Sequence, residues 1–195
     1  MPDFANFFSS RPLLADGAMG TVLYARGIFI NRCYDELNLS DPNLITSIHE
    51  EYLQAGADVL ETNTFGANRF RLTRHGLAEK VAEINAAGVK LARQAVEHLK
   101  DKQAGDAWVA GSVGPLGVRL EPLGKVGLDE ARAAFSEQIA ALAHAGVDLL
   151  IIETMPALNE AHEALRAAKE TAPDLPVLVM PKSAVRLPTK SSGDT

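Results

Sequence analysis

Five short apolar runs recur along the chain, each bounded by glycine or polar residues. They lie at residues 13–15, 57–60, 108–113, 147–152 and 177–180. Their apolar character is nearly continuous and does not alternate with polar positions, which is typical of strands in a parallel sheet that helices cover on both faces. The runs therefore predict five buried parallel strands.

Helical spacing of apolar residues separates these runs. Residues 79–99 and 129–144 repeat apolar positions every three or four residues, and shorter patterns lie at 42–55 and 159–170. At 42–55, Asp41 is suited to cap the helix, Pro42 to occupy its first position and Gly56 to end it. Alternating strands and helices with short connections predict an α/β fold with a parallel sheet, either a closed barrel or a doubly wound open sheet.

The alternating pattern ends after Pro181. Residues 182–195 contain only three aliphatic side chains, and their local charge is positive although the whole chain has a formal net charge of −6. We therefore expect residues 1–181 to form one folded body and residues 182–195 to be an irregular tail.

Carboxylates gather where the predicted strands end. Asp16, Glu61 and Glu153 each follow a different apolar run. The carboxyl ends of parallel strands converge on one face of the fold, so these side chains are expected to share a mouth. Such a group would hold a cationic amine, while the backbone at Gly17 and Gly20 would approach a ligand carboxylate closely.

A purely structural role is the alternative for these positions. Asp16 and Asn63 would then cap the helices that follow them, and the glycines would only make tight turns. The coincidence of such residues at four strand ends favours a binding site. Glu61 and Glu153 would also suit the acid and base of an unrelated α/β lyase, but no Lys or His stands at the first four strand ends to form a Schiff base or carry protons.

Composition argues against several classes of partner. The chain has 19 Lys and Arg against 25 Asp and Glu and no long basic run, which is unlike a nucleic-acid-binding protein. No uncharged apolar stretch approaches the roughly 20 residues that cross a bilayer, and the N-terminus lacks the pattern of a secretory signal. The single cysteine, Cys33, fits a reducing compartment. We expect a soluble cytoplasmic protein.

Two further motifs give no functional signal. His49-Glu50 begins like the helix of a zinc protease, but position 53 is leucine, so we expect His49 to lie on a solvated helix face. Gly111, Gly114 and Gly117 are spaced differently from the glycines of a nucleotide-binding loop. Cys33 is expected to be a buried or inert thiol.

Five stretches resemble, in the same order, the homocysteine S-methyltransferase family, which includes the homocysteine-binding module of methionine synthase and betaine-homocysteine methyltransferase. They are LLADGAMGTVLYARG, CYDELNLSDPNLI, HEEYLQAGADVLETNTFGANR, VAGSVGPLG and AGVDLLIIETM. The resemblance implies a (β/α)8 TIM barrel. This chain would hold about five βα units, because a closed barrel typically needs about 250 residues.

The resemblance also implies an activity, the transfer of a methyl group to the thiol of homocysteine, which gives methionine. The methyl donor would be methyltetrahydrofolate through methylcobalamin, betaine or S-methylmethionine. By resemblance, Asp16 and Glu153 help hold the amino group of homocysteine, and the backbone around Gly17 and Ala18 receives its carboxylate. The residues implied to bind the substrate are Asp16, Gly17, Ala18, Asn63, Ser112 and Glu153.

In this family, zinc held by three cysteines of the later strands binds the homocysteine sulfur as a thiolate. Cys33 is the only cysteine of this chain and does not match a ligand position of the family. We therefore expect these 195 residues to lack the metal half of the site, to bind zinc poorly and to form no methionine alone. The alternative is a non-catalytic homocysteine-binding or interaction module, completed by another chain or in an oligomer.

Overall fold

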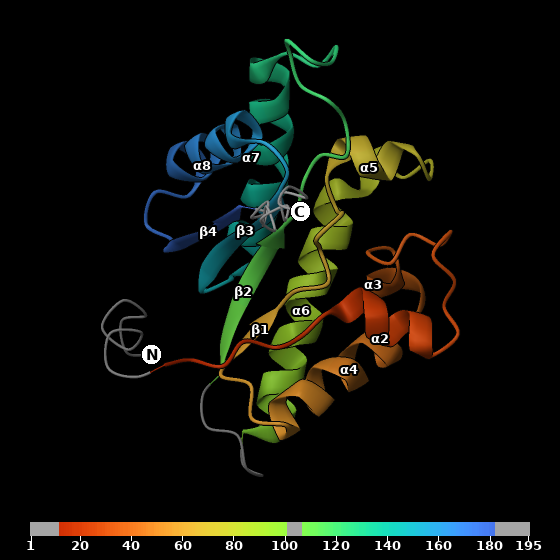
Figure 1. Ribbon diagram of the computed structural model, residues 1–195. Coiled ribbons are helices and arrows are strands. Elements are labelled where there is room, and N and C mark those ends of the chain that lie inside the picture. Colours follow the sequence, from red (N-terminus) through yellow and green to blue (C-terminus); the bar gives the residue numbers. More distant parts are fainter. Residues whose placement is uncertain (1–11, 101–106, 182–195) are drawn as a thin grey trace, which may run out of the picture.

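A parallel sheet forms the centre of the protein (Figure 1). The computed structural model describes residues 12–100 and 107–181, so the predicted tail at 182–195 lies outside the described residues. The strands follow one another in the order β1-β2-β3-β4, which confirms the predicted α/β class. Their bounds are β1 (Val59–Glu61), β2 (Trp108–Val113), β3 (Leu149–Met155) and β4 (Val177–Pro181).

The first predicted strand, at 13–15, is reduced to a single parallel bridge between Ala15 and Val59. Its backbone still pairs beside β1: the Asp16 N–H donates to the Val59 carbonyl at 2.9 Å, and the Val59 N–H donates to that of Leu14 at 3.2 Å. The ladder stops there because the Leu14 N–H turns to the carboxylate of Asp58, 2.9 Å away. The segment nevertheless holds a strand's place beside β1.

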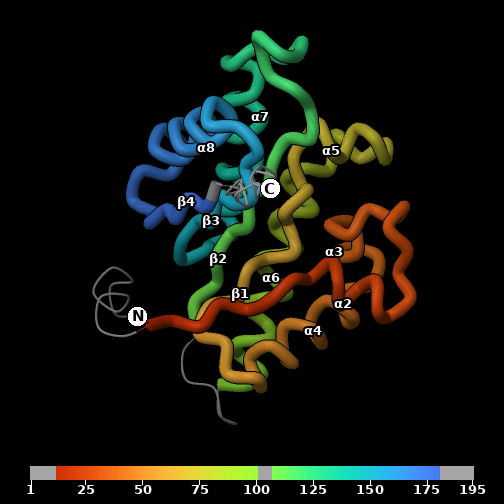
Figure 2. Tube along the Cα trace, in the orientation of Figure 1, coloured from red at the N-terminus to blue at the C-terminus, as the bar shows by residue number. Residues whose placement is uncertain are grey.

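The longer helices follow the predicted ones closely and lie against the sheet (Figure 2). Helix α4 contacts β1, α6 and α7 contact β2, and α8 contacts β3 and β4. Asp41 caps α4 by accepting from the Leu44 N–H at 3.3 Å, and Gly146 ends α7 in the left-handed conformation. The helices are α4 (Pro42–Gln54), α6 (Val81–Leu99), α7 (Leu128–Ala145) and α8 (Leu158–Thr171).

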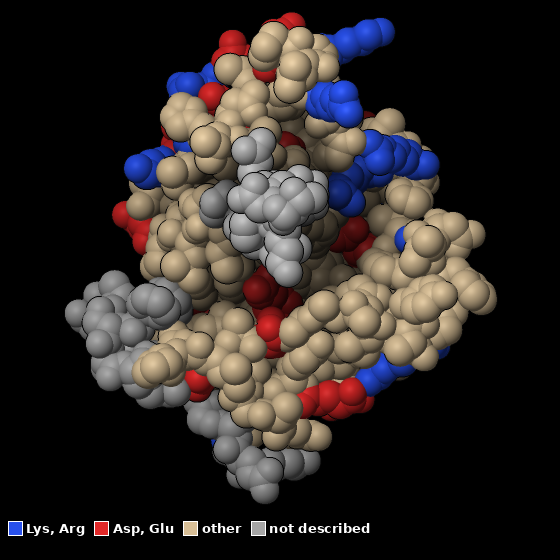
Figure 3. Space-filling view, viewed as in Figure 1, with Lys and Arg blue, Asp and Glu red and all other residues tan. Residues whose placement is uncertain are grey.

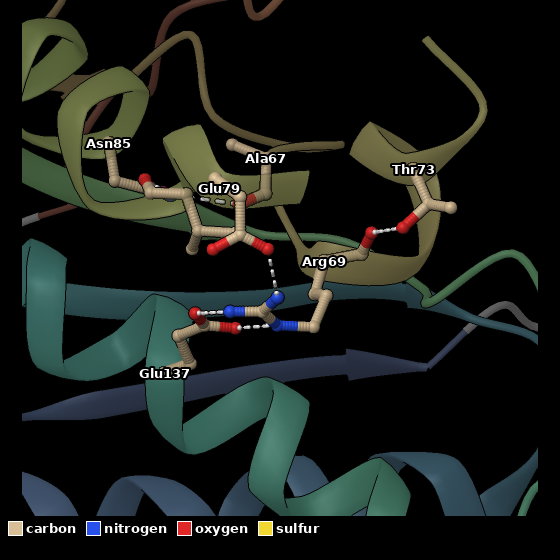
Figure 4. Close-up of polar contacts among 7 residues, drawn as sticks. Ala67, Arg69, Thr73, Glu79, Asn85 and Glu137 are labelled. Carbon is tan, nitrogen blue, oxygen red and sulfur yellow. Dashed lines mark hydrogen bonds and ion pairs between the residues drawn. The ribbon is translucent and has the colours of Figure 1, made fainter. Parts of the chain in front are cut away.

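Three short helices carry too few residues to show a periodic pattern and were not predicted. They are α2 (Met19–Ala25), α3 (Leu37–Ser40) and α5 (Arg69–Thr73), and a 3₁₀ turn, η1 (Ala78–Lys80), precedes α6. Figure 4 shows how α5 is held: Arg69 lies between Glu137 of α7 and Glu79 of η1, and its Nε donates to Glu137 Oε2 at 2.9 Å. Within the described ranges, every helix is too short or too polar to cross a bilayer.

Alternate residues of each strand face opposite sides of the sheet. Leu60, Val109 and Leu150 belong to the large core formed with the helices. The intervening positions form a second, smaller core whose buried members are Val59, Trp108, Ala110, Leu149 and Ile151. The same two-residue spacing places Glu61, Ser112 and Glu153 on this second face, at the carboxyl ends of β1, β2 and β3.

The expectation that His49 lies on a solvated helix face is wrong. Its side chain is fully buried, and neither ring nitrogen has a hydrogen-bond partner among residues 12–100 and 107–181. Helix α4 packs against α3 and α6 as well as β1. These neighbours cover the face of α4 that would point into water if the helix packed on the sheet alone. Burial lowers the pKa of His49 to about 4, which keeps the ring neutral at physiological pH.

His49 should make the protein sensitive to acid. The pKa of His49 in the folded protein lies below its ordinary value of 6.5. The stability that the neutral ring contributes is therefore complete above pH 6.5 and is lost as the pH falls towards 4. Between pH 7 and pH 5 the free energy of unfolding should fall by about 2 kcal/mol. His49→Leu should remove this loss and, by deleting unpaired polar atoms, raise the free energy of unfolding at pH 7 by about 1 kcal/mol. Urea denaturation followed by circular dichroism at both pH values measures this.

The matched control is His144→Gln, because His144 is exposed in the last turn of α7. This variant should keep the acid sensitivity of the parent chain. If His49→Leu lost as much stability between pH 7 and pH 5 as the parent chain, a group other than His49 would be the cause of the acid sensitivity.

Candidate functional site

A cleft of about 910 Å³ opens at the carboxyl ends of the strands. Figure 3 shows it as a hollow with acidic side chains on its floor. The loop after residue 15, the loop after β1, and the ends of β2 and β3 form its walls. The structure brings all the predicted site residues to this cleft: Asp16, Gly17, Ala18, Asn63, Ser112 and Glu153.

Three carboxyl groups form the acidic floor: Asp16, Glu61 and Glu153. Asp16 Oδ2 accepts from the Glu61 N–H at 3.1 Å, while its Oδ1 is buried and has no hydrogen-bond partner in the part of the chain that the structure describes. Glu153 Oε1 accepts from the Ser112 hydroxyl at 2.7 Å. One buried carboxylate oxygen of the floor is therefore left to be satisfied by something outside the described chain.

The floor favours protons because its negative charges are close together and partly removed from water. Burial, with a smaller contribution from the charge of Glu153, raises the pKa of Asp16 to about 7. Burial also raises the pKa of Glu61, and the neighbouring carboxyl groups of Glu153 and Asp16 raise it further. Carboxyl groups this close together and partly buried favour the uptake of a proton by the group as a whole.

The conformation of β3 at its end brings Glu153 into the cleft. Thr154 has a φ of 57°, which is rare for a residue other than glycine and costs about 1–3 kcal/mol. The pairing of β3 with β4 shifts register between Glu153 and Met155. The strained residue thus directly follows the carboxylate of the floor, where binding sites often store strain.

The structure contradicts the alternative in which Asp16 and Asn63 cap helices. The cap position of α2 is Ala18, which makes no side-chain cap bond. Asn63 instead donates from Nδ2 to the Tyr34 carbonyl at 2.7 Å and to Asn38 Oδ1 at 3.0 Å. Asn38 returns a bond from its Nδ2 to the Asn63 carbonyl at 2.8 Å. Asn63 therefore belongs to a buried network that fixes the loop after β1.

The backbone at Gly17 lies close to the side chain of Tyr52. A Cβ at Gly17 would lie 2.9 Å from the Tyr52 hydroxyl. The adjoining Ala18 leads directly into α2. The absence of a side chain at Gly17 keeps this segment on the wall of the cleft beside Asp16.

A second wall of the cleft escaped the sequence analysis. Asp35 accepts from the Gly66 N–H at 2.8 Å, and Arg71 donates from Nε to the Pro115 carbonyl at 2.9 Å. Asp35 lies in a loop and Arg71 in the middle of a five-residue helix, and neither segment is long enough to show an apolar periodicity. The unpredicted lining residues with polar or aromatic side chains are Tyr24, Arg32, Tyr34, Asp35, Phe65, Arg71 and His75.

The described residues do not fit a zinc site. A structural or catalytic zinc needs at least three protein ligands from Cys, His, Asp or Glu, and no group of three that could hold a metal occurs in residues 12–100 and 107–181. Cys33 lines the cleft, but burial and the charge of Asp35 raise the pKa of its thiol to about 11. The thiol stays protonated, whereas a zinc ligand is a thiolate.

Comparison with known proteins gives a consistent relationship. A model of the homocysteine S-methyltransferase family matches residues 13–194. Methionine synthase from Mycobacterium tuberculosis is 31% identical over 173 residues, which are 86% of this chain and 14% of that protein. Methionine synthase from Mycobacterium leprae is 30% identical over 187 residues, which are 91% of this chain and 15% of that protein.

Solved structures give the same relationship. The homocysteine methyltransferase MmuM from Escherichia coli superposes with a TM-score of 0.76 in its metallated form, at 30% identity over 88% of this chain and 64% of that one. Its oxidized form gives 0.79 at 28% identity, over 92% and 65%. This likeness confirms the predicted barrel class. The chain thus spans less than two thirds of the solved methyltransferase and about a seventh of the methionine synthases.

The acidic floor should lower the stability of the unliganded protein at neutral and alkaline pH. The folded pKa of Asp16, about 7, lies above its ordinary value of 3.8, so the stability it contributes is complete below pH 3.8 and is lost as the pH rises through 7. Asp16→Asn keeps an acceptor for the Glu61 N–H and should raise the free energy of unfolding at pH 8 by about 2 kcal/mol, with little change at pH 4. Urea denaturation at the two pH values tests this.

Asp129→Asn serves as the control, since the Asp129 side chain is 93% exposed. It should leave stability within about 0.5 kcal/mol at both pH values. A stability gain in Asp16→Asn that does not change with pH would contradict the electrostatic cause.

Proposed function

Because the chain belongs to the homocysteine S-methyltransferase family, we propose that its cleft binds homocysteine and forms the amino-acid-binding part of an enzyme that methylates the homocysteine sulfur. The observation that carries this proposal is the floor of three carboxyl groups, with one buried Asp16 oxygen that lacks a partner. The described residues alone supply this binding function.

The acidic floor suits the amino group of an amino acid. An ammonium group has three donors and a positive charge, so it would satisfy Asp16 Oδ1 and separate the negative charges of Asp16 and Glu153. Ser112, which donates to Glu153 Oε1, would hold that carboxylate in place. Ligand binding would then favour the ionised forms of Asp16 and Glu61, whose pKa values are raised in the empty cleft.

The carboxylate of the amino acid would lie at the backbone of Gly17 and Ala18. Both residues line the cleft next to Asp16, and no side chain caps the N-terminus of α2 that follows. Backbone N–H groups at such a point are suited to an anion. A zwitterionic amino acid would thus span from this segment to the acidic floor, with its side chain directed along the cleft.

In the proposed reaction the homocysteine sulfur receives the methyl group and methionine is formed. Zinc, where the family uses it, supplies a stabilised thiolate, but the described residues offer no ligand set for it, and the part proposed for them is to bind and orient the amino acid. The methyl donor, whether methyltetrahydrofolate, methylcobalamin or betaine, and a cytoplasmic location also belong to the proposal.

Calorimetry with homocysteine in the presence of a reductant tests the binding function. We expect a binding constant that improves by about a hundredfold between pH 6 and pH 8, because the ligand displaces about one proton in total from Asp16 and Glu61. In buffers of different ionisation enthalpy, about one proton per ligand should be released at pH 7. Glu153→Gln and Asp16→Asn should each weaken binding by about tenfold or more.

Glu170→Gln is the matched control, since Glu170 lies near the C-terminal end of α8, does not line the cleft and forms an ion pair with Arg166. Absence of binding heat, or equal affinity in Asp16→Asn, would contradict the proposal. Binding without methionine formation from any of the donors named above would instead favour the alternative, a non-catalytic homocysteine-binding module completed by another chain.

A further inference from the structure

The cleft carries opposite charges on two of its walls. The floor is acidic, with Asp16, Glu61 and Glu153, whereas the wall formed by α5 and the turn after it presents Arg71 and His75. Figure 3 shows basic side chains on one rim of the hollow that has acidic ones at its floor. The amino-acid-binding function proposed above uses only the acidic side and the adjoining backbone.

Arg71 is held in a fixed orientation. Its Nε donates to the Pro115 carbonyl at 2.9 Å, and its guanidinium carbon lies 5.4 Å from the centre of the Phe65 ring. Across the described residues, Arg71 makes no ion pair within 4.0 Å, and neither of its Nη atoms donates a hydrogen bond. The outer edge of the guanidinium fork is therefore available to a ligand in the cleft.

The helix that carries Arg71 is anchored from several sides. Asn68 caps α5 by accepting from the Arg71 N–H at 3.1 Å, and Arg69 ties the helix to Glu137 of α7 (Figure 4). Thr73 adds a bond from its hydroxyl to the Arg69 carbonyl at 2.7 Å. The basic wall is thus fixed to the same helix layer that supports the acidic floor.

The charge of the basic wall is only partly balanced inside the protein. Asp35 interacts with both Arg71 and His75, but burial raises its pKa, and its Oδ1 is already occupied by the Gly66 N–H. Glu160 also interacts with Arg71, and burial raises its pKa too. Among the described residues, neither Asp35 nor Glu160 forms an ion pair with Arg71, and their carboxylates instead accept from the Gly66 and Leu116 N–H groups.

The cleft is large enough for two small molecules. Its volume of about 910 Å³ lies near the upper end of the roughly 300–1,000 Å³ of clefts that take drug-sized ligands, and homocysteine is much smaller than such a ligand. An amino acid bound between Gly17 and the acidic floor leaves the side towards Arg71 open. A methyl transfer needs its second substrate in that same cleft.

We propose that Arg71, with His75 on the same wall, forms an anion subsite that binds a carboxylate of the second substrate, the methyl donor. The proposal rests on the proposed function in one respect only, namely that a second substrate shares the cleft. The subsite would orient the donor with its carboxylate at the basic wall and the rest of the molecule towards the bound amino acid.

A carboxylate fits this wall better than a phosphate. The two Nη atoms of one guanidinium match the two oxygens of a planar carboxylate in parallel hydrogen bonds. A phosphate with two charges is repelled more strongly than a singly charged carboxylate by the negative charge that the carboxyl groups of the same cleft keep, Glu153 among them. One fixed arginine offers too little positive charge to offset that repulsion.

Amide NMR of the isotope-labelled 195-residue chain tests the subsite with acetate as the probe and inorganic phosphate as the comparison. A Cβ at either Gly66 or Gly117 would lie 3.3 Å from an Arg71 side-chain atom, so their amide signals report on the subsite. Acetate should shift both signals at millimolar concentration. Phosphate at equal ionic strength should shift them at least threefold less.

Arg71→Gln should reduce the acetate shifts at least fivefold, while Arg71→Lys, which keeps the charge without the fork, should lose the preference for acetate over phosphate. The fold should survive, because the Pro115 carbonyl keeps a bond from Asn68 Nδ2 at 3.3 Å. Arg166→Gln, on the exposed surface of α8, is the control and should leave the shifts unchanged. Equal acetate shifts in Arg71→Gln, or a stronger response to phosphate, would overturn the proposal.

A homocysteine titration of the same variants separates this inference from the proposed function. Homocysteine should perturb signals near Gly17, and Asp16→Asn should abolish the effect whereas Arg71→Gln should not. If homocysteine fails to bind but the acetate-induced shifts still depend on Arg71, the anion subsite stands and the proposed function fails. If homocysteine binds but the acetate-induced shifts do not depend on Arg71, only the subsite fails.

Discussion

The parallel register of the strands is the constraint on which the site depends. Adjacent strands pair so that Glu61 lies beside Ala110, Ser112 beside Ile151 and Glu153 beside Met180. Because side chains alternate between the two faces of each strand, this register directs the polar residues to the face opposite the helices. Apolar residues of the same face, such as Trp108 and Leu149, close the space beneath them. A shift of one residue in any strand would turn its polar side chain into the helix layer.

The helix layer makes this arrangement rigid. Phe135, Ile139 and Leu142 of α7 pack in the large core with Val109 and Leu150 of the sheet. Buried amide side chains connect the layer to the loop after β1: Gln138 donates to the Thr64 carbonyl at 2.7 Å. Breaking such a bond would leave a buried polar group unpaired, which destabilises the fold by about 1–3 kcal/mol. The bond therefore holds the backbone of this loop in place beside the cleft.

The cleft itself departs from what would be most stable. Asp16 and Glu61 have raised pKa values because their charges are partly buried and close to Glu153, and Thr154 has a left-handed conformation. Each feature opposes folding and is maintained by the surrounding structure. A ligand with a positive charge would relieve the electrostatic part, so the groups that weaken the empty protein are those that the proposed substrate would stabilise.

The order of strands and helices could be predicted from the sequence because apolar periodicity records which side of each element is buried. Asp41 and Gly56 also acted as predicted, since a cap and a left-handed glycine depend on their own neighbours in the chain. The shared position of the acidic residues could also be predicted, because the carboxyl ends of parallel strands meet on one side of the fold. The first strand was overestimated because its hydrogen bonding depends on Asp58, which is distant in sequence.

Local sequence by itself therefore determined the fold class and the set of residues at the strand ends. Only the tertiary structure decided that Glu61 and Glu153 meet in one cleft, that His49 is enclosed, and that Arg71 lines the cleft that holds the acidic floor. The physical reason is that periodicity reports the burial of one element. The distance between side chains of different elements depends on strand register, loop paths and helix packing, which no local pattern contains.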